Sequence, residues 1–348
     1  MRQLYQKLSL LSISLLIAMI MATILGGHYE IIKALGQGTF GETYLAKDTH
    51  LPDEPFRVVK RLKIFANPSA FDTVKRLFDT EAETLYKLGS HDQIPQLFAH
   101  FEENQEFYLV QELVDGHDLT EEIQPGRKFT ETEVIEILRE ILEILVYVHQ
   151  EGVIHRDIKP SNLMRRKSDG KIVMIDFGAV KQVTTSLNQG QKTISIGTEG
   201  YMPVEQDLGN PKLCSDIYAV GMIGIQALTG IYPHLLGKDK NGEVLWQNHV
   251  NTSPELAKIL NKMIRYDFNK RYQTPSEVLQ ALDIFASQVN TYSSTYKVTH
   301  VQPKFKFWMI PAIIALITII SFFVGFAIFS TPKTQQPAKN SPSRNIQW

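Results

Sequence analysis

The sequence predicts an α+β fold with two lobes, a small strand-rich one followed by a larger helical one, and a transmembrane helix near the C-terminus. Short runs rich in β-branched and aromatic residues, which are typical of strands, gather before residue 112. Beyond Gly116, apolar residues recur mostly at helical spacing. Residues 307–329 contain no charged residue, and a helix of that length, at about 1.5 Å per residue, spans a hydrocarbon core of about 30 Å.

The small lobe, residues 28–113, is predicted from its strands. Runs of strand-forming residues occupy positions 29–33, 42–47, 56–63 and 106–111. Between the last two, residues 69–88 have the pattern of a helix.

The larger lobe, residues 114–287, is predicted from its helix ends. Thr130 and Glu133 form a capping box, apolar residues follow at helical spacing as far as Val148, and Gly152 ends the helix. A second helix is predicted behind residues 253–254. A third is opened by residues 274–277, in which a proline takes the first helical position.

The outer segments differ from globular sequence. Residues 1–27 form a hydrophobic N-terminal extension, and residues 288–306 lack periodicity and are a predicted juxtamembrane linker. For residues 307–329, a buried core helix is the alternative to a membrane span, but core helices usually carry a polar stripe, and this run has only Thr318 and Ser321. Residues 330–348 are polar, rich in Pro and Ser, and predicted to be disordered.

The bulk composition excludes several classes of protein. A formal net charge of -1 gives no polyelectrolyte signal, so no nucleic-acid partner is expected. Cys214 is the only cysteine, and a single thiol forms neither an internal disulfide nor a zinc site, which suits a reducing compartment.

A glycine motif follows the first predicted strand. Gly36, Gly38 and Gly41 form the pattern G-x-G-x-x-G, in which a backbone without Cβ atoms can approach phosphates and offer its N–H groups. Alone the motif is weak, and an ordinary turn is as good an explanation. Because it lies between two predicted strands rather than before a helix, it favours a hairpin that covers a nucleotide over a dinucleotide-binding turn.

A lysine lies near the end of the third predicted strand. Lys60 has apolar neighbours, which is common for a surface lysine, but a cation aimed at a phosphate is the sharper interpretation. A buried lysine needs a counter-ion. Glu81 on the predicted helix is the candidate, and Glu83, two residues away, lies on a different face of that helix.

Residues 153–164, VIHRDIKPSNLM, place three polar groups within six positions: Asp157, Lys159 and Asn162. The apolar run that follows, at 171–178, predicts a strand that ends in Asp176. Asn162 and Asp176 offer oxygen ligands that suit Mg²⁺ bridging phosphates. Asp157 is then placed to accept a proton from an incoming hydroxyl, and Lys159 to steady the charge of a transferring phosphoryl group.

Taken in order, these motifs resemble the signature set of the eukaryotic-type serine/threonine protein kinases found in bacteria. The resemblance covers residues 28–287 and includes the glycine loop, the strand lysine, the helix glutamate, H-R-D-x-K-x-x-N, D-F-G and an A-P-E-like segment. It implies a bilobal protein-kinase fold. It also implies transfer of the γ-phosphate of ATP to Ser/Thr hydroxyls of protein substrates, including the chain's own activation segment, with a homodimer for trans-autophosphorylation.

The resemblance also implies a role for each matching residue. Asp157 would be the catalytic base, Lys159 its neighbouring cation, and Lys60 the phosphate contact paired to Glu81. Asn162 and Asp176 would bind Mg²⁺. ATP would be held by Lys60, by the hinge residues Glu112 and Leu113, and by a loop made of Leu35, Gly36, Gln37, Gly38, Thr39, Phe40, Gly41, Glu42 and Thr43. Gln111 would be the gatekeeper.

The activation segment would run from Asp176 to Glu205, and five of its hydroxyls are candidate phosphosites that Arg156 would receive: Thr184, Thr185, Ser186, Thr193 and Ser195. Thr198 resembles the family residue that contacts the catalytic base. Two further residues are expected to be scaffold, Asp216 holding the catalytic-loop backbone and Glu205 pairing with Arg271. Two positions depart from the family pattern: Val204 stands in the A-P-E-like triplet, and Thr43 replaces the usual valine over the adenine.

The N-terminal apolar run, residues 8–25, has three interpretations: a membrane span, a signal peptide, or a stretch that is not normally translated. Arg2 and Lys7 would hold its N-terminus inside, which would put the kinase domain outside, away from ATP. The hypothesis is therefore that translation begins at Met21, or at Met19, and that the kinase domain is cytoplasmic and anchored to the membrane by residues 307–329. Two alternatives to an active protein kinase remain, a nucleotide-binding pseudokinase and a kinase-fold enzyme that acts on a small molecule.

Overall fold

The computed structural model describes residues 24–38, 41–62, 71–177 and 200–296. The chain divides into two compact units, Met1–Val289 and Asn290–Trp348. Of the second unit, the described part is the end of helix α8.

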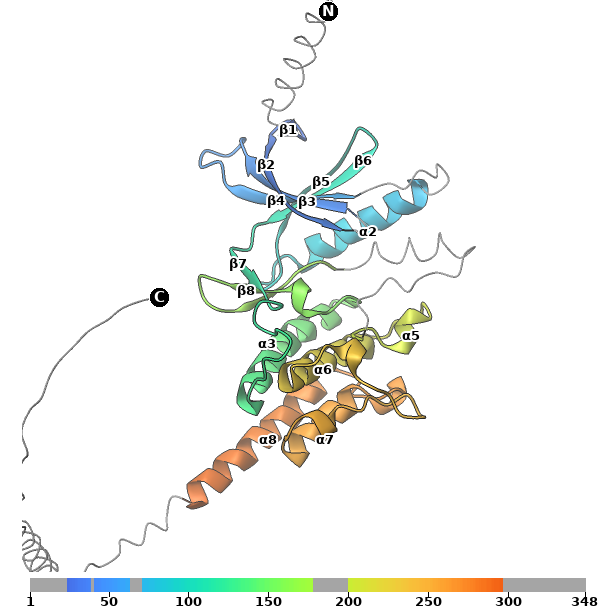
Figure 1. The fold of residues 1–348 in the computed structure, drawn as a ribbon. Coiled ribbons are helices and arrows are strands. Elements are labelled where there is room, and N and C mark those ends of the chain that lie inside the picture. Colours follow the sequence, from blue (N-terminus) through green and yellow to red (C-terminus); the bar gives the residue numbers. More distant parts are fainter. Residues whose placement is uncertain (1–23, 39–40, 63–70, 178–199, 297–348) are drawn as a thin grey trace, which may run out of the picture. The chain divides into compact units, whose positions relative to one another are not determined.

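A six-stranded antiparallel sheet forms most of the first lobe (Figure 1). Its strand order is β1-β2-β3-β4-β6-β5, so consecutive strands are mostly neighbours. The strands are β1 Ile24–Leu25, β2 Tyr29–Gly38, β3 Gly41–Asp48, β4 Phe56–Leu62, β5 Leu97–Glu103 and β6 Glu106–Glu112. Helix α2, Phe71–Leu88, contacts β5 and β6.

The two faces of this sheet bury different sets of residues. Along β6, Phe107 and Leu109 join the main core together with Phe78 and Leu85 of α2. The alternate residues Tyr108 and Val110 join a smaller core on the other face, with Leu25, Tyr29, Ala46 and Val59. Because strand side chains alternate between faces, a strand buried on both sides must be apolar at nearly every position, as β6 is.

The second lobe consists mainly of helices: α3 Glu131–Gln150, α5 Val204–Asp207, α6 Leu213–Thr229, α7 Pro254–Met263 and α8 Pro275–Tyr296. A three-stranded antiparallel sheet lies beside them, with β7 Gly116–Asp118, β8 Leu163–Arg166 and β9 Ile172–Met174. Single 3-10 turns cover Pro160–Asn162, Pro233–Leu235, Gln247–His249 and Phe268–Lys270.

The predicted helix ends are found in the structure. Thr130 and Glu133 form the capping box of α3, and Gly152 follows that helix with a φ of 71°. Ser253 caps α7, with its side chain accepting from the N–H of Leu256. At the start of α8, the N–H of Glu277 donates to Oγ1 of Thr274 over 3.3 Å. These features were predictable because capping depends on local sequence alone.

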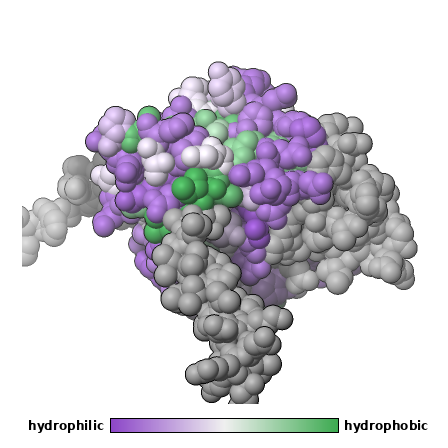
Figure 2. Space-filling view, turned by 90° about the horizontal axis from the view of Figure 1, so that it is seen from above, coloured by the Kyte–Doolittle hydropathy of each residue, from purple (hydrophilic) through white to green (hydrophobic). Residues whose placement is uncertain are grey.

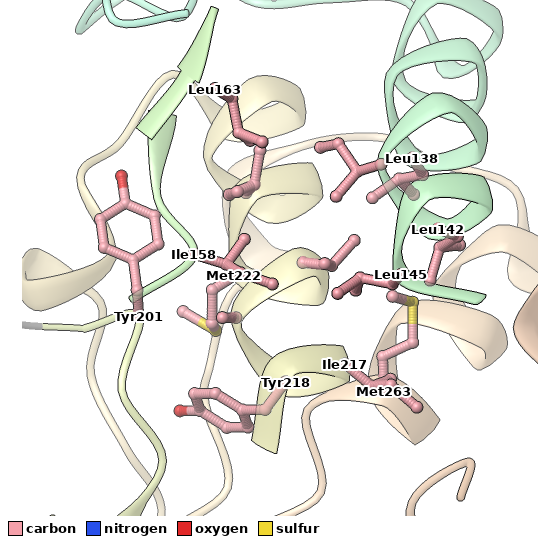
Figure 3. Close-up of a cluster of buried hydrophobic side chains, with 14 of the residues drawn as sticks. Leu138, Leu142, Leu145, Ile158, Leu163, Tyr201, Ile217, Tyr218, Met222 and Met263 are labelled. Carbon is pink, nitrogen blue, oxygen red and sulfur yellow. The ribbon is translucent and has the colours of Figure 1, made fainter. Parts of the chain in front are cut away.

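The core of the helical lobe is packed between α3 and α6 (Figure 3). Leu138, Leu142 and Leu145 of α3 face the side chains of α6, and Met263 of α7 closes the cluster from below. Ile158 of the loop after α3 enters the same cluster and is buried. The loop that carries Asp157 and Lys159 is thus anchored in the core by the residue between them.

The structure differs from the sequence expectations in several places. Strands β1, β5, β7 and β8 and helices α5 and α6 were not predicted. Strand β9 ends at Met174 rather than at Asp176. Helix α8 continues to Tyr296, so its last turns lie within residues 288–306, which were expected to form a linker.

Two further observations concern the surface and the membrane. Seen from above, the strand-rich lobe is covered mostly by hydrophilic residues around a small hydrophobic area (Figure 2). Among its exposed apolar side chains are Ile24 and Ile32.

Within the described ranges, no helix has the length and apolar character needed to cross a membrane. The predicted span at 307–329 and residues 8–23 of the N-terminal run at 8–25 lie outside these ranges, whereas the last two residues of that run, Ile24 and Leu25, form strand β1 beside β2.

Candidate active site

Three of the predicted site residues meet in the loop between α3 and β8. Nζ of Lys159 lies 3.2 Å from Oδ2 of Asp157. The side-chain amide of Asn162 donates to the same Oδ2 over 2.6 Å and to the backbone oxygen of Asp157 over 2.7 Å. The carboxylate of Asp157 is therefore held between a cation and an amide.

The donors of Asn162 determine where its oxygen lies. Both hydrogen bonds to Asp157 come from Nδ2, so the amide oxygen remains as an acceptor on the other side of the group. Asp176 lies two residues beyond β9, and the N–H of Ile175 donates to the backbone oxygen of Asn162 over 3.0 Å. The backbone thus links the two predicted metal ligands.

These two side chains fit a magnesium ion. Mg²⁺ prefers oxygen ligands and is usually bound by one or two carboxylates together with phosphates and water. No group of three or more His, Cys, Asp or Glu side chains suited to a metal occurs in the part of the chain that the structure describes. The protein's share of a magnesium site would come from Asn162 and Asp176.

Lys60 on β4 reaches Asp176 across the two lobes. Its Nζ lies 3.3 Å from Oδ1 of Asp176. The expected ion pair of Lys60 with Glu81 is not among the ion pairs of the described residues, although Glu81 is buried on α2, at 4% exposure. A partly buried ammonium takes as counter-ion the carboxylate that reaches it, and here that carboxylate is Asp176.

The charges of the site shift two pKa values. The positive charge of Lys60 lowers the pKa of the Asp176 carboxyl, although burial opposes the shift. Burial lowers the pKa of Lys159, and the negative charge of Asp176 partly offsets that effect. These interactions favour the ionised form of Asp176, which its predicted role as a magnesium ligand requires.

Asp216 at the start of α6 holds the loop before Asp157. It is 1% exposed, and its two carboxylate oxygens accept from the N–H groups of His155 and Arg156, each over 2.9 Å. The ring nitrogen Nε2 of His149 lies 2.9 Å from Oδ2 of Asp216. This arrangement confirms that Asp216 is a scaffold residue for the catalytic loop.

His155 joins this loop to the end of β9. Its ring packs against Phe177 with 4.6 Å between centroids, and its Nε2 lies 3.1 Å from the oxygen of Ile175. Nδ1 of the same ring accepts from the N–H of Asp157 over 3.3 Å. Sequence reasoning gave His155 no role, although its place directly before Arg156 and Asp157 was a usable signal.

The second predicted scaffold pair is also present. Arg271 donates to Oε1 of Glu205 over 2.6 Å and to Oε2 over 3.1 Å. Both residues are buried, at 3% and 5% exposure, and Ser215 donates to the same carboxylate over 2.7 Å. This two-point pair attaches α5 to the segment before α8.

The glycine loop joins β2 to β3 and is described on either side of Thr39 and Phe40. A Cβ atom at Gly41 would lie 2.1 Å from the backbone oxygen of Arg61, whereas one at Gly36 would meet nothing within 4 Å. Gly41 is thus required by the close approach of β4, and Gly36 leaves open space above the strand. Leu35 and Gln37 are exposed.

The other residues predicted to hold ATP lie on β3, β4 and β6. Thr43 and Lys60 are direct cross-strand partners. Glu42 forms an ion pair with Arg61 and accepts from the amide of Gln37 over 3.1 Å. Glu112 ends β6, where its N–H donates to the oxygen of Gln96 over 2.9 Å, and the half-buried Leu113 follows it.

The structure also describes the burial of the expected gatekeeper and the backbone conformation of Arg156. Gln111, the expected gatekeeper, is 4% exposed on β6, and Arg156 has a φ of 68°. The candidate phosphosites Thr184, Thr185, Ser186, Thr193 and Ser195 lie outside the described residues, as does Thr198.

Known proteins are similar to this chain in sequence. Residues 29–282 match the family model of the protein kinase domain. Serine/threonine-protein kinase B of Synechocystis sp. is 42% identical over 269 residues, which cover 75% of this chain and 47% of that protein. Serine/threonine-protein kinase PknA of Nostoc sp. is 43% identical over 272 residues, covering 76% of this chain and 48% of that one.

Solved structures show the same architecture. A mutant of the PknI kinase domain of Mycobacterium tuberculosis superimposes with a TM-score of 0.59 at 22% identity, over 77% of this chain and 99% of that one. The apo form of PpkA-294 gives a TM-score of 0.61 at 22% identity, over 75% of this chain and 98% of that one. At this identity the likeness shows the fold, with its strand-rich and helical lobes.

The chain therefore belongs to the protein kinase family, and its kinase domain is of the bacterial, eukaryotic-type serine/threonine kind. It spans about half the length of these curated relatives, 47% and 48%.

Proposed function

We propose that this protein transfers the γ-phosphate of ATP to Ser and Thr hydroxyls of protein substrates. The observation that carries the proposal is the cluster of Asp157, Lys159 and Asn162 facing the Lys60–Asp176 pair. Phosphoryl transfer needs positioned groups and neutralised charge more than covalent chemistry, and these five side chains supply both.

Each residue has a stated role in this proposal. Asp157 orients the incoming hydroxyl and accepts its proton. Lys159, already 3.2 Å from that carboxylate, balances the negative charge that develops beside it. Lys60 contacts phosphate oxygens, and Asn162 and Asp176 hold Mg²⁺, which supplies charge neutralisation when it is bound.

The test compares the full-length chain with its Asp157→Asn variant in a γ-phosphate transfer assay with ATP and Mg²⁺. The variant should retain its melting temperature and lose about 10²- to 10⁴-fold in rate, the usual contribution of a general base. Asp53→Asn, an exposed acid in the β3–β4 loop, is the matched control and should keep the wild-type rate. Wild-type protein that binds ATP and Mg²⁺ but labels no Ser or Thr would overturn the proposal in favour of a nucleotide-binding scaffold.

We also propose that the kinase phosphorylates its own activation segment and acts at a membrane. The first part rests on the hydroxyls between residues 184 and 195 and on Arg156 beside Asp157. The second rests on the charge-free run at 307–329, with the kinase domain on the cytoplasmic side, where ATP is available.

Two measurements test these parts separately. Mass spectrometry of the chain before and after incubation with ATP should find phosphate on residues 184–195, and Asp157→Asn should remove it. The full-length chain should sediment with membranes after a carbonate wash, and deletion of residues 307–329 should release it. Phosphate found elsewhere, or a chain that stays in the supernatant, would contradict the respective part.

A further inference from the structure

A glutamine on the short helix α5 contacts the catalytic loop. Nε2 of Gln206 donates to the backbone oxygen of Arg156 over 2.5 Å. This oxygen belongs to the peptide that joins Arg156 to Asp157, so the side chain of Gln206 is one peptide away from the proposed base. Gln206 is partly buried.

The backbone at Arg156 needs such support. Its φ of 68° lies in the left-handed region, which a non-glycine residue occupies only when the surroundings hold it there. The N–H of Arg156 is held by Oδ1 of Asp216 over 2.9 Å. The carbonyl of the same residue is held by Gln206. Asp216 and Gln206 therefore fix the peptides on the two sides of one strained residue.

Fixing this carbonyl also orients Asp157. A peptide group is planar, so the direction of the Arg156 oxygen determines the direction of the Asp157 N–H. That N–H points to Nδ1 of His155 over 3.3 Å. Rotation of the peptide would turn the Cα–Cβ bond of Asp157 and move its carboxylate away from Lys159 and Asn162.

The backbone of helix α5, which carries Gln206, is held in place by neighbouring residues. Glu205, the preceding residue, is held by Arg271 and Ser215 in a buried network. Pro203, three residues before Gln206, accepts from its N–H over 3.1 Å. A side chain on an anchored backbone can hold its partner to within a few tenths of an ångström, as positioning requires.

We propose that Gln206 is a positioning residue for Asp157, holding the Arg156 carbonyl so that the Asp157 carboxylate faces the incoming hydroxyl. The expected loss of catalytic rate rests on the proposed kinase function. The expected loosening of the loop at residues 155–157 does not. A misplaced catalytic group can cost about a hundredfold in rate, so loss of this one donor should affect turnover.

The test uses the full-length chain with two substitutions of similar length and opposite chemistry. Gln206→Met keeps the volume and removes the donor, and Gln206→Lys keeps a donor. We expect Gln206→Met to lower kcat about 10- to 100-fold with the KM for ATP roughly unchanged, since the side chain of Gln206 donates to Arg156, which is not one of the residues predicted to hold ATP. Gln206→Lys should stay within about threefold of wild type, because its ammonium can donate to the same carbonyl.

Amide hydrogen exchange supplies a second readout that needs no activity. Gln206→Met should speed exchange at residues 155–157, and Gln206→Lys should not. Leu208→Ala, a change at a 78% exposed residue beside α5, is the control for disturbance of the helix surface and should change neither readout. Melting temperatures identify any variant that fails to fold.

Each outcome decides the inference. Gln206→Met with wild-type exchange at 155–157 overturns it. Equal losses in Gln206→Met and Gln206→Lys also overturn it, because they indicate that the glutamine fills space rather than donates. If wild-type protein transfers no phosphate, the proposed function fails. The exchange data at residues 155–157 then decide on their own whether the hydrogen bond from Gln206 keeps the loop in place.

Discussion

Nζ of Lys60 lies 3.3 Å from Oδ1 of Asp176, so a strand lysine of the small lobe is paired with an acid that follows the last strand of the large one. The side chain of Lys60 is 18% exposed and that of Asp176 is 40% exposed. A pair of this exposure contributes little to stability. Its significance is positional, because one contact brings together the proposed phosphate-binding cation and one of the two proposed metal ligands.

Replacing Lys60 with methionine should therefore affect activity much more than stability. We expect the rate of phosphoryl transfer to fall about 10²- to 10³-fold, since a cation aimed at the reacting phosphate is lost. The free energy of unfolding should change by no more than about 1 kcal/mol. Lys47→Met is the matched control, because Lys47 lies on the neighbouring strand β3 in a surface pair with Glu54 at 3.2 Å. A Lys60→Met chain of near wild-type rate would remove Lys60 from the proposed site.

The sequence was sufficient where structure depends on near neighbours. The caps at Thr130 and Ser253 follow from side chains that bond to backbone groups within three residues. The cluster of Asp157, Lys159 and Asn162 also formed as expected, because six consecutive positions in one loop cannot lie far apart.

The sequence was insufficient for elements and contacts that depend on tertiary packing. Helix α6 is buried along nearly its whole surface, so it lacks the polar stripe by which a helix is found. Edge strand β5 is half-buried and carries large apolar residues on both faces, including the exposed Phe98. Lys60 pairs with Asp176 rather than with the expected Glu81, and Gln206 contacts Arg156. Both contacts join segments that are far apart in the sequence, and no spacing of residues along the chain predicts them.

The two glycines of the nucleotide loop should respond differently to the same substitution. Gly41→Ala places a Cβ 2.1 Å from the backbone oxygen of Arg61, so the β3–β4 pairing must shift. We expect a loss of about 1–3 kcal/mol of unfolding free energy, the usual range for overpacking. Gly36→Ala meets no atom within 4 Å and should leave stability within about 1 kcal/mol.

The same pair separates structural from ligand-binding roles. Because Gly36 leaves open space, its added methyl group should raise the KM for ATP if the loop covers phosphates. Chemical denaturation and the KM for ATP are measured on both variants. Equal stability of the two variants would contradict the close approach at Gly41, and an unchanged KM in Gly36→Ala would contradict the phosphate-covering role.

Asp216→Asn should weaken both the fold and the catalytic loop. The carboxylate accepts from two backbone N–H groups and faces a ring nitrogen of His149, whereas an asparagine has one oxygen and presents an NH₂ group to a donor. Leaving a buried donor unsatisfied costs about 1–3 kcal/mol, and the rate should fall at least tenfold as Asp157 loses its support. Asp283→Asn, at a surface pair with Arg139, should change stability by less than about 1 kcal/mol. Similar melting curves for both variants would argue against the scaffold role of Asp216.

Glu205 should make stability depend on pH in the acid range. Burial alone would raise the pKa of its carboxyl, but hydrogen bonds from Arg271 and Ser215 outweigh burial and hold the pKa below the ordinary value of 4.5. The folded chain therefore binds this proton less readily than the unfolded chain. The stabilising contribution of Glu205 is present above a pH of about 4.5 and is lost as the pH falls through the lowered folded pKa.

The measurement is the free energy of unfolding of wild type and Glu205→Gln between pH 7 and pH 3. At pH 7 the variant should be less stable by about 3–5 kcal/mol, because it leaves Arg271 buried without its counter-ion. The difference should shrink as the pH falls from about 4.5 through the lowered folded pKa, since the unfolded wild-type chain binds the proton first and the folded carboxyl becomes protonated only at lower pH. A chain with both Glu205→Leu and Arg271→Leu should lose less than Glu205→Gln alone, because no charge remains buried. A difference that stays constant with pH would show that the carboxylate charge of Glu205 is not what holds Arg271.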